Sequence, residues 1–508
     1  MSTSSGGQNP GLDGLDPERW GLPPAAVAGL AGELFDCWER FHHCFTTRTR
    51  DTSHLAHVYL KGLLLLPDQR NYANIARRII GPDDDGQALQ HFLSDSPWDS
   101  QRLFAQIQEE IRLDTGLRGG ILSLDESGDK RSGELSAGAG RQYLGRLGKV
   151  DVGQVGVALS YSVEDFWALL DAELYLPVDW FDDAHAKLRQ RLHVPEAQTF
   201  ATKPQIGLKL VLRAHAQGLP FTAVAADAVY GRDSAFRAGL DEEKILYVAD
   251  VPSDYPVYTQ QPVVGVPQAS SDRGRPPSKP QVLNGVKSVP VSSLVNEATG
   301  WQTLAIRQGE RGAIEVTGWA VRVWTISDDW QVRQEWLVVH RQSNGKQQYS
   351  LSNAPADTPL RTLLEWRGQR YFAERTFQDS KSELGWDELV AQKYRAWMHH
   401  TALDALALYF LMRVRRHWAE QYPRAEGLKE ELGVGKLPAL SVANLRELLR
   451  AVMPLRQFTR QDALRVVIRH LHNRACSTAS RCRKQARQRQ AAARGSPCQP
   501  AVATSEKR

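Results

Sequence analysis

Three acidic residues, Asp125, Asp227 and Glu374, are spread across most of this 508-residue chain. Asp125 and Asp227 each end a short apolar run that is typical of a buried strand. A carboxylate at the end of such a strand is costly to bury unless it binds something. Three converging carboxylates repel one another unless divalent cations neutralise them. This combination favours phosphoryl transfer on nucleic acid, in which two metal ions share one acidic site.

Glu374 has two cationic neighbours at helical spacing. Arg370 precedes it by four residues, Lys381 follows it by seven, and a helical pattern continues to about Trp418. On a helix these three side chains fall within a narrow sector of one face. Such a face can bind metal through the carboxylate while its cations hold a phosphate backbone. Taken alone, the pattern favours a solvated ion-pair stripe, but the two strand-end aspartates shift the interpretation to a metal site.

These residues resemble a known signature, Tyr-x2-Arg-x3-Glu-x6-Lys. Arg370, Glu374 and Lys381 match three of its four positions, and Arg367 stands where the signature has Tyr. Further matching stretches are residues 89–93, 96–99, 141–145 and 227–231. On these motifs, the chain between about residues 60 and 415 resembles bacterial insertion-sequence transposases of the DDE class, and more closely the insertion-sequence seven-oh-one family.

The resemblance implies an α/β protein with an RNase H-like catalytic core. It places the first Asp on the first strand, the second Asp after the fourth strand, and the Glu on a later helix. It implies that Asp125, Asp227 and Glu374 are the catalytic residues and the ligands of two Mg²⁺ ions, which Mn²⁺ can replace. Arg370 and Lys381 are then expected to hold the DNA backbone near the scissile phosphate. The expected partners are double-stranded DNA, at the element ends and at the target, and a second copy of the chain in a homodimer on DNA.

Composition and periodicity divide the chain into segments. Residues 24–115 have apolar residues at helical spacing, with Arg70, Arg77 and Arg78 among them, which suits DNA docking or a dimer contact equally. Asp227 and Glu374 are too far apart for a compact core, so an insertion is expected between them. The expected division is 1–23 disordered, 24–115 a helical DNA-binding domain, 116–250 the first part of the RNase H-like core, 251–362 a β-rich insertion, 363–455 the helical second part of the core, and 456–508 a basic, largely disordered tail.

Within these segments we predict individual elements from apolar runs. The strands are expected at residues 119–125, 155–161, 166–175 and 221–227 in the core, with a crossover helix at 203–217, and at residues 313–317, 320–324, 336–340 and 348–352 in the insertion. Alternation along the first strand turns Glu126 to the face opposite Asp125. We therefore do not expect Glu126 to replace Asp125 as a metal ligand.

Positive charge is concentrated at the end of the chain. The net charge is only +5, but the chain from Arg456 onward has 13 Lys and Arg against 2 Asp and Glu. Such a tail is typical of a nucleic-acid-seeking appendage, or of a solubilising tail. Arg273 and Arg275, on either side of Gly274 in a Pro-rich stretch, resemble the core of a minor-groove AT-hook, a short match that is frequent by chance.

The remaining composition argues against a membrane-spanning protein and against a disulfide-linked one. Apolar content of 42% is that of a globular protein, and no apolar run is long enough to span a membrane. Five Cys in a chain of this length favour reduced thiols and a cytoplasmic, nucleoid-associated protein. The favoured function is a DDE transposase that cleaves and transfers DNA strands. The alternatives are an RNase H-like DNA endonuclease without strand transfer, a non-catalytic DNA-binding protein derived from a transposase, and a structural protein with scattered acidic residues.

Overall fold

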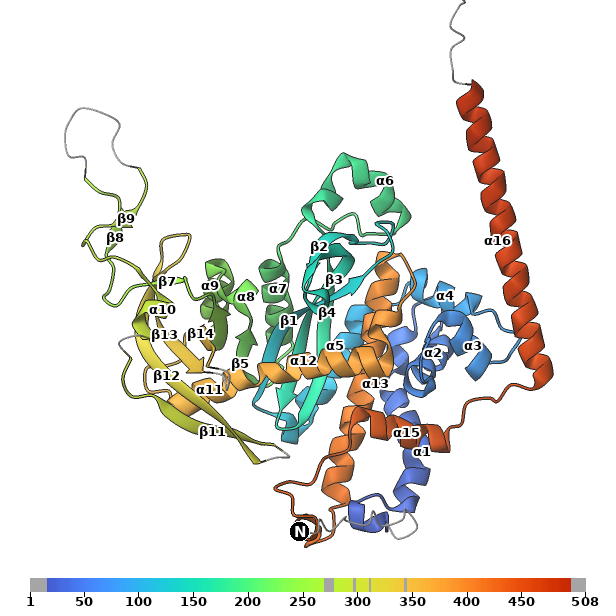
Figure 1. Ribbon diagram of the computed structural model, residues 1–508, viewed down its shortest axis with the longest axis horizontal. Helices are drawn as coiled ribbons and strands as arrows, with labels where there is room; N and C mark the ends of the chain where they lie inside the picture. The colour runs from blue at the N-terminus through green and yellow to red at the C-terminus, as the bar shows by residue number, and fades with distance from the viewer. Residues whose placement is uncertain (1–15, 269–277, 296–297, 310–311, 342–344, 495–508) are drawn as a thin grey trace, which may run out of the picture.

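A computed structural model describes residues 16–268, 278–295, 298–309, 312–341 and 345–494 (Figure 1). Arg273 and Arg275 lie outside the described residues, as do most of the expected disordered N-terminus and the last residues of the tail. Within the described part, helices surround one large mixed sheet, so the α/β class is confirmed. No described helix combines the length and apolar composition needed to cross a bilayer.

The central sheet has ten strands in the order β11-β12-β13-β14-β6-β5-β1-β3-β2, with β4 also paired to β3. The pairs β1–β5 and β5–β6 are parallel, and the remaining pairs are antiparallel. The strands are β1 (Gly120–Lys130), β2 (Gly140–Leu144), β3 (Lys149–Val163), β4 (Phe166–Tyr175), β5 (Phe221–Ala226), β6 (Tyr247–Val251), β11 (Gln302–Gly309), β12 (Gly312–Ile326), β13 (Val332–Arg341) and β14 (Gln347–Ser352). Two further ribbons pair β7 (Pro256–Val257) with β10 (Val289–Pro290), and β8 (Val264–Gly265) with β9 (Gln281–Val282).

The strands β11 to β14, which lie between Asp227 and Glu374 in the chain, continue the central sheet rather than forming a separate one. They make a meander, β11 to β14, whose last strand pairs antiparallel with β6. The two strand-like runs at 313–317 and 320–324 form the single long strand β12. This half of the sheet has its own apolar clusters, one of which includes Val323, Leu337 and Leu351.

The helices before β1 share their apolar core with the sheet. One cluster runs from Ala26 to Leu449 and includes residues of α1 to α5, β1, β3, β4 and α13. The long helix α13 lies between β4 and the helices α2, α4 and α5 (Figure 1). The helices are α1 (Pro24–Phe41), α2 (Ser53–Leu65), α3 (Tyr72–Ile79), α4 (Gln87–Ser94), α5 (Ser100–Leu113), α6 (Asp183–Arg191), α7 (Lys203–Ala216), α8 (Ala228–Gly231), α9 (Ser234–Glu242), α10 (Val291–Leu294), α11 (Leu360–Gly368), α12 (Arg370–Asp379), α13 (Tyr394–Gln421), α14 (Leu428–Glu431), α15 (Val442–Val452) and α16 (Arg460–Arg494).

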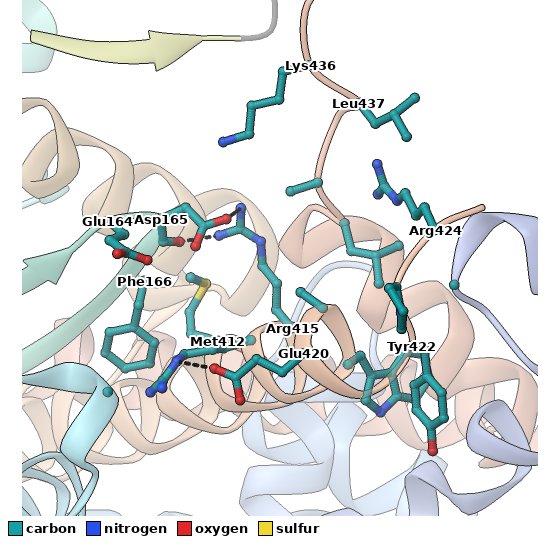
Figure 2. A pocket seen from close by; sticks show the side chains of 18 of the residues that line it. Glu164, Asp165, Phe166, Met412, Arg415, Glu420, Tyr422, Arg424, Lys436 and Leu437 are labelled. Atoms are coloured by element: carbon teal, nitrogen blue, oxygen red, sulfur yellow. Dashed lines mark hydrogen bonds and ion pairs between the residues drawn. The ribbon is translucent and has the colours of Figure 1, made fainter. Parts of the chain in front are cut away.

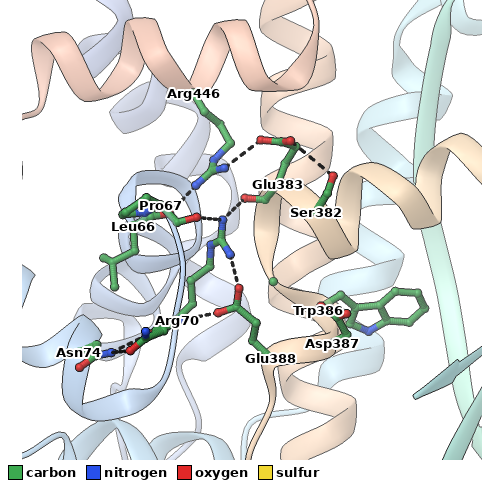
Figure 3. Close-up of polar contacts among 12 residues, drawn as sticks. Leu66, Pro67, Arg70, Asn74, Ser382, Glu383, Trp386, Asp387, Glu388 and Arg446 are labelled. Atoms are coloured by element: carbon green, nitrogen blue, oxygen red, sulfur yellow. Dashed lines mark hydrogen bonds and ion pairs between the residues drawn. The ribbon is translucent and has the colours of Figure 1, made fainter. Parts of the chain in front are cut away.

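A buried polar network also ties the first helices to the segment after α12 (Figure 3). Arg70 pairs with Glu388 at 2.5 Å and donates to the carbonyl oxygen of Glu383 at 2.6 Å. Arg446 donates to the carboxylate of Glu383 at 3.0 Å and to the carbonyl oxygen of Leu64 at 2.9 Å. Because the Arg70 side chain is only 1% exposed, the expectation that it suits DNA docking is wrong. It stabilises the packing of two distant segments instead.

The helical pattern expected from Glu374 to about Trp418 is not one helix. α12 ends at Asp379, a π-helical turn covers Ser380–Leu384, and α13 begins only at Tyr394. Gly385 has a φ of 80°, a conformation that glycine adopts without strain, and it ends the π-helical turn. The break allows α12 and α13 to run in different directions, as Figure 1 shows.

Two strand expectations also need correction. β1 continues to Lys130, so Asp125 lies in the middle of the strand and not at its end. The ladder extends because backbone groups of β3, from Val157 to Gly153, pair with the polar residues after Asp125. The short strand β2 adds an edge strand beside β3, so Asp227 follows the fifth strand in chain order.

The basic tail is ordered as a helix over most of its length. α16 is 35 residues long, which corrects the expectation that residues 456–508 are largely disordered. The abundance of Ala, Arg and Gln, all good helix formers, explains this helix. Arg465 and Arg469 approach Asp83 at 3.7 and 3.5 Å, and the residues from 471 to 490 are all exposed. Figure 1 shows α16 projecting from the rest of the protein.

Candidate active site

The parallel pairing of β1 with β5 brings two of the three acidic residues together. Leu124 is the direct partner of Ala226, and the next residues in the chain are Asp125 and Asp227. Neighbouring strands lie about 4.8 Å apart, so the two carboxylates occupy one small region of the sheet. Asp227 also caps α8, because its carboxylate accepts a hydrogen bond from the Val229 amide at 2.9 Å.

Alternation along β1 separates Asp125 from its acidic neighbour. Glu126 pairs with Lys203 of α7 at 2.5 Å, whereas the Asp125 carboxylate lies 3.9 Å from Arg370 of α12. The prediction that Glu126 turns to the opposite face is therefore confirmed. The Asp125 side chain is 24% exposed and remains open to a small ligand.

Burial and mutual repulsion perturb both aspartates. Burial raises the pKa of Asp125 to about 7, with the Arg370 charge opposing this shift and the Asp227 charge adding to it. Burial likewise raises the pKa of Asp227. Two carboxyl groups that resist ionisation next to each other are suited to exchange a proton for a divalent cation. Their oxygen donors fit Mg²⁺ or Mn²⁺.

Glu374, the third acidic residue, does not form a three-residue cluster with Asp125 and Asp227. Among the residues that the structure describes, no group of three or more His, Cys, Asp and Glu side chains is close enough to hold a metal ion. Glu374 is exposed on α12 and lines a cavity of about 440 Å³ together with Lys381 and Gln378. Its charge acts on Arg370, one helical turn earlier.

Arg370 is the common neighbour of the acidic groups. Negative charges on Asp250, Asp125, Asp227 and Glu374 offset the effect of burial and raise the pKa of its guanidinium above the ordinary value. Its closest partner is Asp250, whose Oδ2 accepts a hydrogen bond from Nη1 at 2.8 Å. This side chain therefore remains charged at every pH at which the protein folds.

Asp250 is a site residue that the sequence reasoning missed. It lies near the end of β6, next to β5 in the sheet, and so repeats the arrangement of an acidic residue after an apolar run. Applied to residues 246–250, the rule that identifies Asp125 and Asp227 also finds it. Arg367, at the Tyr position of the signature, donates to both Asp250 oxygens at 3.0 and 2.9 Å.

Lys381 is anchored to β1. Its Nζ lies 2.6 Å from the Asp129 carboxylate and 3.4 Å from the carbonyl oxygen of Gly128. Lys381 belongs to the π-helical turn after α12, and its side chain is 16% exposed. The pairing holds that turn against the strand carrying Asp125.

A more enclosed cavity, of about 450 Å³, lies away from the acidic residues (Figure 2). It is lined by the second half of α13, the turn between β3 and β4, and the segment before α15. Two of its arginines are paired, since Arg415 lies 3.2 Å from Asp165 and Arg416 lies 3.0 Å from Glu420. None of Asp125, Asp227 and Glu374 lines this cavity, so it lies outside the candidate active site.

Comparison with known proteins identifies the family of this chain. Residues 40–313, more than half of the chain, match the family model described as DDE superfamily endonuclease. The chain belongs to the DDE superfamily of endonucleases. The matched range of this DDE endonuclease includes Asp125 and Asp227 and ends before Glu374.

The DDE endonuclease is also similar to a named transposase. It is 29% identical over 318 residues to the "Probable transposase for insertion sequence element IS701" of Microchaete diplosiphon. The alignment covers 62% of this chain and 71% of that protein. The resemblance to insertion-sequence transposases inferred from the motifs is thus confirmed.

A third cavity, of about 1240 Å³, lies between α12 and the β11–β12 hairpin. Three side chains in it could not be found from the sequence: Arg307, Tyr371 and Arg375. The Arg307 guanidinium lies 4.2 Å from the centre of the Tyr371 ring, and Tyr371 is 48% exposed. Cationic and aromatic groups in an open groove are suited to a nucleic-acid strand.

Proposed function

We propose that this DDE endonuclease is a transposase, which cleaves DNA strands at the ends of an insertion sequence and joins them to a target. The observation that carries the proposal is the register of β1 and β5, which sets Asp125 beside Asp227 next to Arg370. The position of Glu374 on the same helix as Arg370 supports its place as the third acidic residue. The similarity to the IS701 transposase supports joining as well as cleavage.

We propose further that the catalytic core is RNase H-like. An Asp on the first strand, an Asp after a strand parallel to it, and a Glu on a later helix support this assignment. The meander β11–β14 lies between the second Asp and the Glu, where an insertion is expected. Residues 116–250 and 363–455 would then make the core, and residues 251–362 the insertion.

Asp125, Asp227 and Glu374 are proposed to hold the two divalent cations. Bound Mg²⁺ supplies a Lewis acid that activates a water or 3′-hydroxyl nucleophile and stabilises the leaving oxygen of an in-line displacement. Asp125 and Asp227 must release their protons to serve as ligands. The pKa of Asp125, raised to about 7 by burial, permits this release near neutral pH. Arg370 offers a fixed positive charge to the phosphodiester beside them.

The DNA backbone is proposed to cross the exposed face of α12. Lys381 would exchange its partner Asp129 for a phosphate, and the groove with Arg307, Tyr371 and Arg375 would continue the surface on the other side of the helix. Residues 24–115, where Arg48 and Arg50 are exposed, are proposed to recognise the element ends. The basic half of α16 would add contacts that do not depend on sequence.

Excision from a plasmid carrying the element ends tests the proposal. The wild-type chain should release the element and join it to new DNA, whereas Asp227→Asn should do neither. Asn is chosen because it still caps α8. Release without joining would leave an endonuclease, the first alternative. Full excision by Asp227→Asn would remove this residue from the chemistry.

A further inference from the structure

Asp250 binds the Arg370 guanidinium close to the pair Asp125 and Asp227. The Arg370 Nη1 lies 2.8 Å from Asp250 Oδ2, within hydrogen-bond distance. Its Nη2 lies 3.9 Å from Asp125 Oδ2, beyond hydrogen-bond distance. The guanidinium therefore hydrogen-bonds Asp250 and does not hydrogen-bond Asp125.

Asp250 is itself fixed on several sides. Arg367 binds both of its oxygens, and Ser350 of β14 donates to Oδ1 at 2.6 Å. Arg367 is held in turn by Gln348, whose Oε1 accepts from Nη2 at 2.9 Å. The side chains of Asp250 and Arg367 are 10% and 12% exposed, so this arrangement is largely screened from solvent. A rigid, doubly paired carboxylate fixes the position of the Arg370 head group.

The pair Asp125 and Asp227 attracts positive charge. The Arg370 guanidinium lies 3.9 Å from Asp125, and its charge also acts on Asp227. A guanidinium with bidentate geometry binds carboxylates strongly when partly buried. If it bound the pair, it would compete with divalent cations for the same oxygens. The ion pair between Arg370 and Asp250 opposes such binding.

We propose that Asp250 is a positioning residue that keeps Arg370 off Asp125 and Asp227, and so leaves this pair open to divalent cations. Arg367, at the Tyr position of the signature, is then a brace for Asp250 and not a contact to DNA. The inference rests on the proposed function, in which Asp125 and Asp227 bind the cations. It adds a residue to that site and a reason for the exchange of Tyr for Arg.

Mn²⁺ binding by the full chain without DNA, measured by titration calorimetry or by electron paramagnetic resonance, tests the inference. Asp250→Asn should weaken Mn²⁺ binding by about tenfold, as expected if Arg370 occupies the pair for some nine-tenths of the time. In the double variant Asp250→Asn, Arg370→Gln the affinity should return to at least the wild-type value. Asp165→Asn, which removes a carboxylate paired with Arg415 elsewhere, is the matched control and should bind as the wild type does.

A milder variant guards against loss of folding in Asp250→Asn. Ser350→Ala removes the 2.6 Å hydrogen bond to Asp250 and the 3.2 Å hydrogen bond that Ser350 accepts from Arg367. It leaves both ion pairs of Asp250 in place, so it should weaken Mn²⁺ binding by a smaller factor, again restored by Arg370→Gln. Unchanged affinity in both single variants, or no restoration in the double variants, would overturn the role of Asp250. If Asp125→Asn still abolished binding in that case, the proposed metal site would stand. Wild-type binding that is indifferent to Asp125→Asn would overturn both.

Discussion

Leu124 of β1 and Ala226 of β5 are direct partners in a parallel pair, and each is followed by an aspartate. This one register brings together residues about a hundred positions apart in the chain. A shift by one residue would turn one of the two carboxylates to the other face of the sheet. The acidic pair is therefore a property of strand pairing, stabilised by the apolar cluster around Leu122, Leu124 and Val224.

Metal-free Asp125→Asn should be more stable than the wild type above neutral pH. The Asp125 carboxyl has a pKa of about 7 in the folded protein and an ordinary value near 3.8 in the unfolded chain. Between these values the unfolded chain loses the proton first, so the free energy of unfolding falls as pH rises from about 4 to about 7 and then levels off. Removing the charge should recover about 1–3 kcal/mol at pH 8.

Chemical denaturation at pH 4 and pH 8, with a chelator present, checks this gain. Asn can still accept the hydrogen bond that the Glu126 amide donates to Asp125 at 2.7 Å. Asp165→Asn, which removes a carboxylate paired with Arg415 away from this site, is the control. Equal pH dependence in the wild type and in Asp125→Asn would show that Asp125 titrates normally.

Lys381→Ala should weaken DNA binding and reduce its salt dependence. If Nζ contacts one phosphate, the slope of log K against log salt should fall by about 1. Filter binding over a range of salt concentrations measures this slope. Asp129→Asn is a useful companion, because it removes the competing carboxylate at 2.6 Å and should strengthen binding. The same slope in Lys381→Ala and wild type would reduce Lys381 to a brace between β1 and the π-helical turn.

Arg307→Ala should lower DNA affinity about tenfold if the groove beside α12 holds a strand, since one stacked, partly desolvated arginine contact is worth about 1–2 kcal/mol. Arg307→Lys should recover only part of this, because an ammonium lacks the planar fork of a guanidinium. The matched control is Arg341→Ala, which breaks a similar contact, 4.6 Å from the Trp301 ring centre, outside this groove. Equal losses in Arg307→Ala and Arg341→Ala would contradict a specific role for the groove.

Deleting residues 475–508 should leave the rest of the chain folded and weaken binding to random DNA, most of all at low salt. The contacts of Arg465 and Arg469 with Asp83 remain in this truncation. Discrimination of the element ends should change much less, because phosphate contacts position a protein whereas base contacts specify sequence. A full-length variant with Arg481, Arg483 and Arg487 changed to Gln separates charge from length. Loss of end recognition alone would identify the tail as a sequence-specific reader.

The part of this site that sequence can predict is local. Apolar runs ending in Asp locate Asp125 and Asp227, and alternation places Glu126 on the other face, because strand periodicity is set by the backbone. The same rule finds Asp250 when it is applied to β6. The strands β12, β13 and β14 are predictable for the same reason, although the runs at 313–317 and 320–324, expected as two strands, form the single strand β12.

What sequence cannot predict depends on partners that are distant in the chain. Nothing near Arg70 in sequence shows that Glu388 covers it, so its charge alone suggests a DNA contact. The position of Arg367 in the signature gives no sign of its ion pair with Asp250, which requires α11 to pack near β6. The helix α16, in contrast, does not depend on distant partners. It forms because the helix propensity of its residues prevails over the mutual repulsion of their charges.

The most direct test of the active-site assignment compares two adjacent acidic residues in one assay. Single-turnover cleavage of a DNA duplex carrying an element end is measured against Mg²⁺ concentration for wild type, Asp125→Asn and Glu126→Gln. We predict that Asp125→Asn abolishes cleavage at every Mg²⁺ concentration, while Glu126→Gln, whose partner Lys203 lies on α7, cleaves within a few-fold of wild type. Cleavage by Asp125→Asn at the wild-type rate would contradict the assignment of the active site.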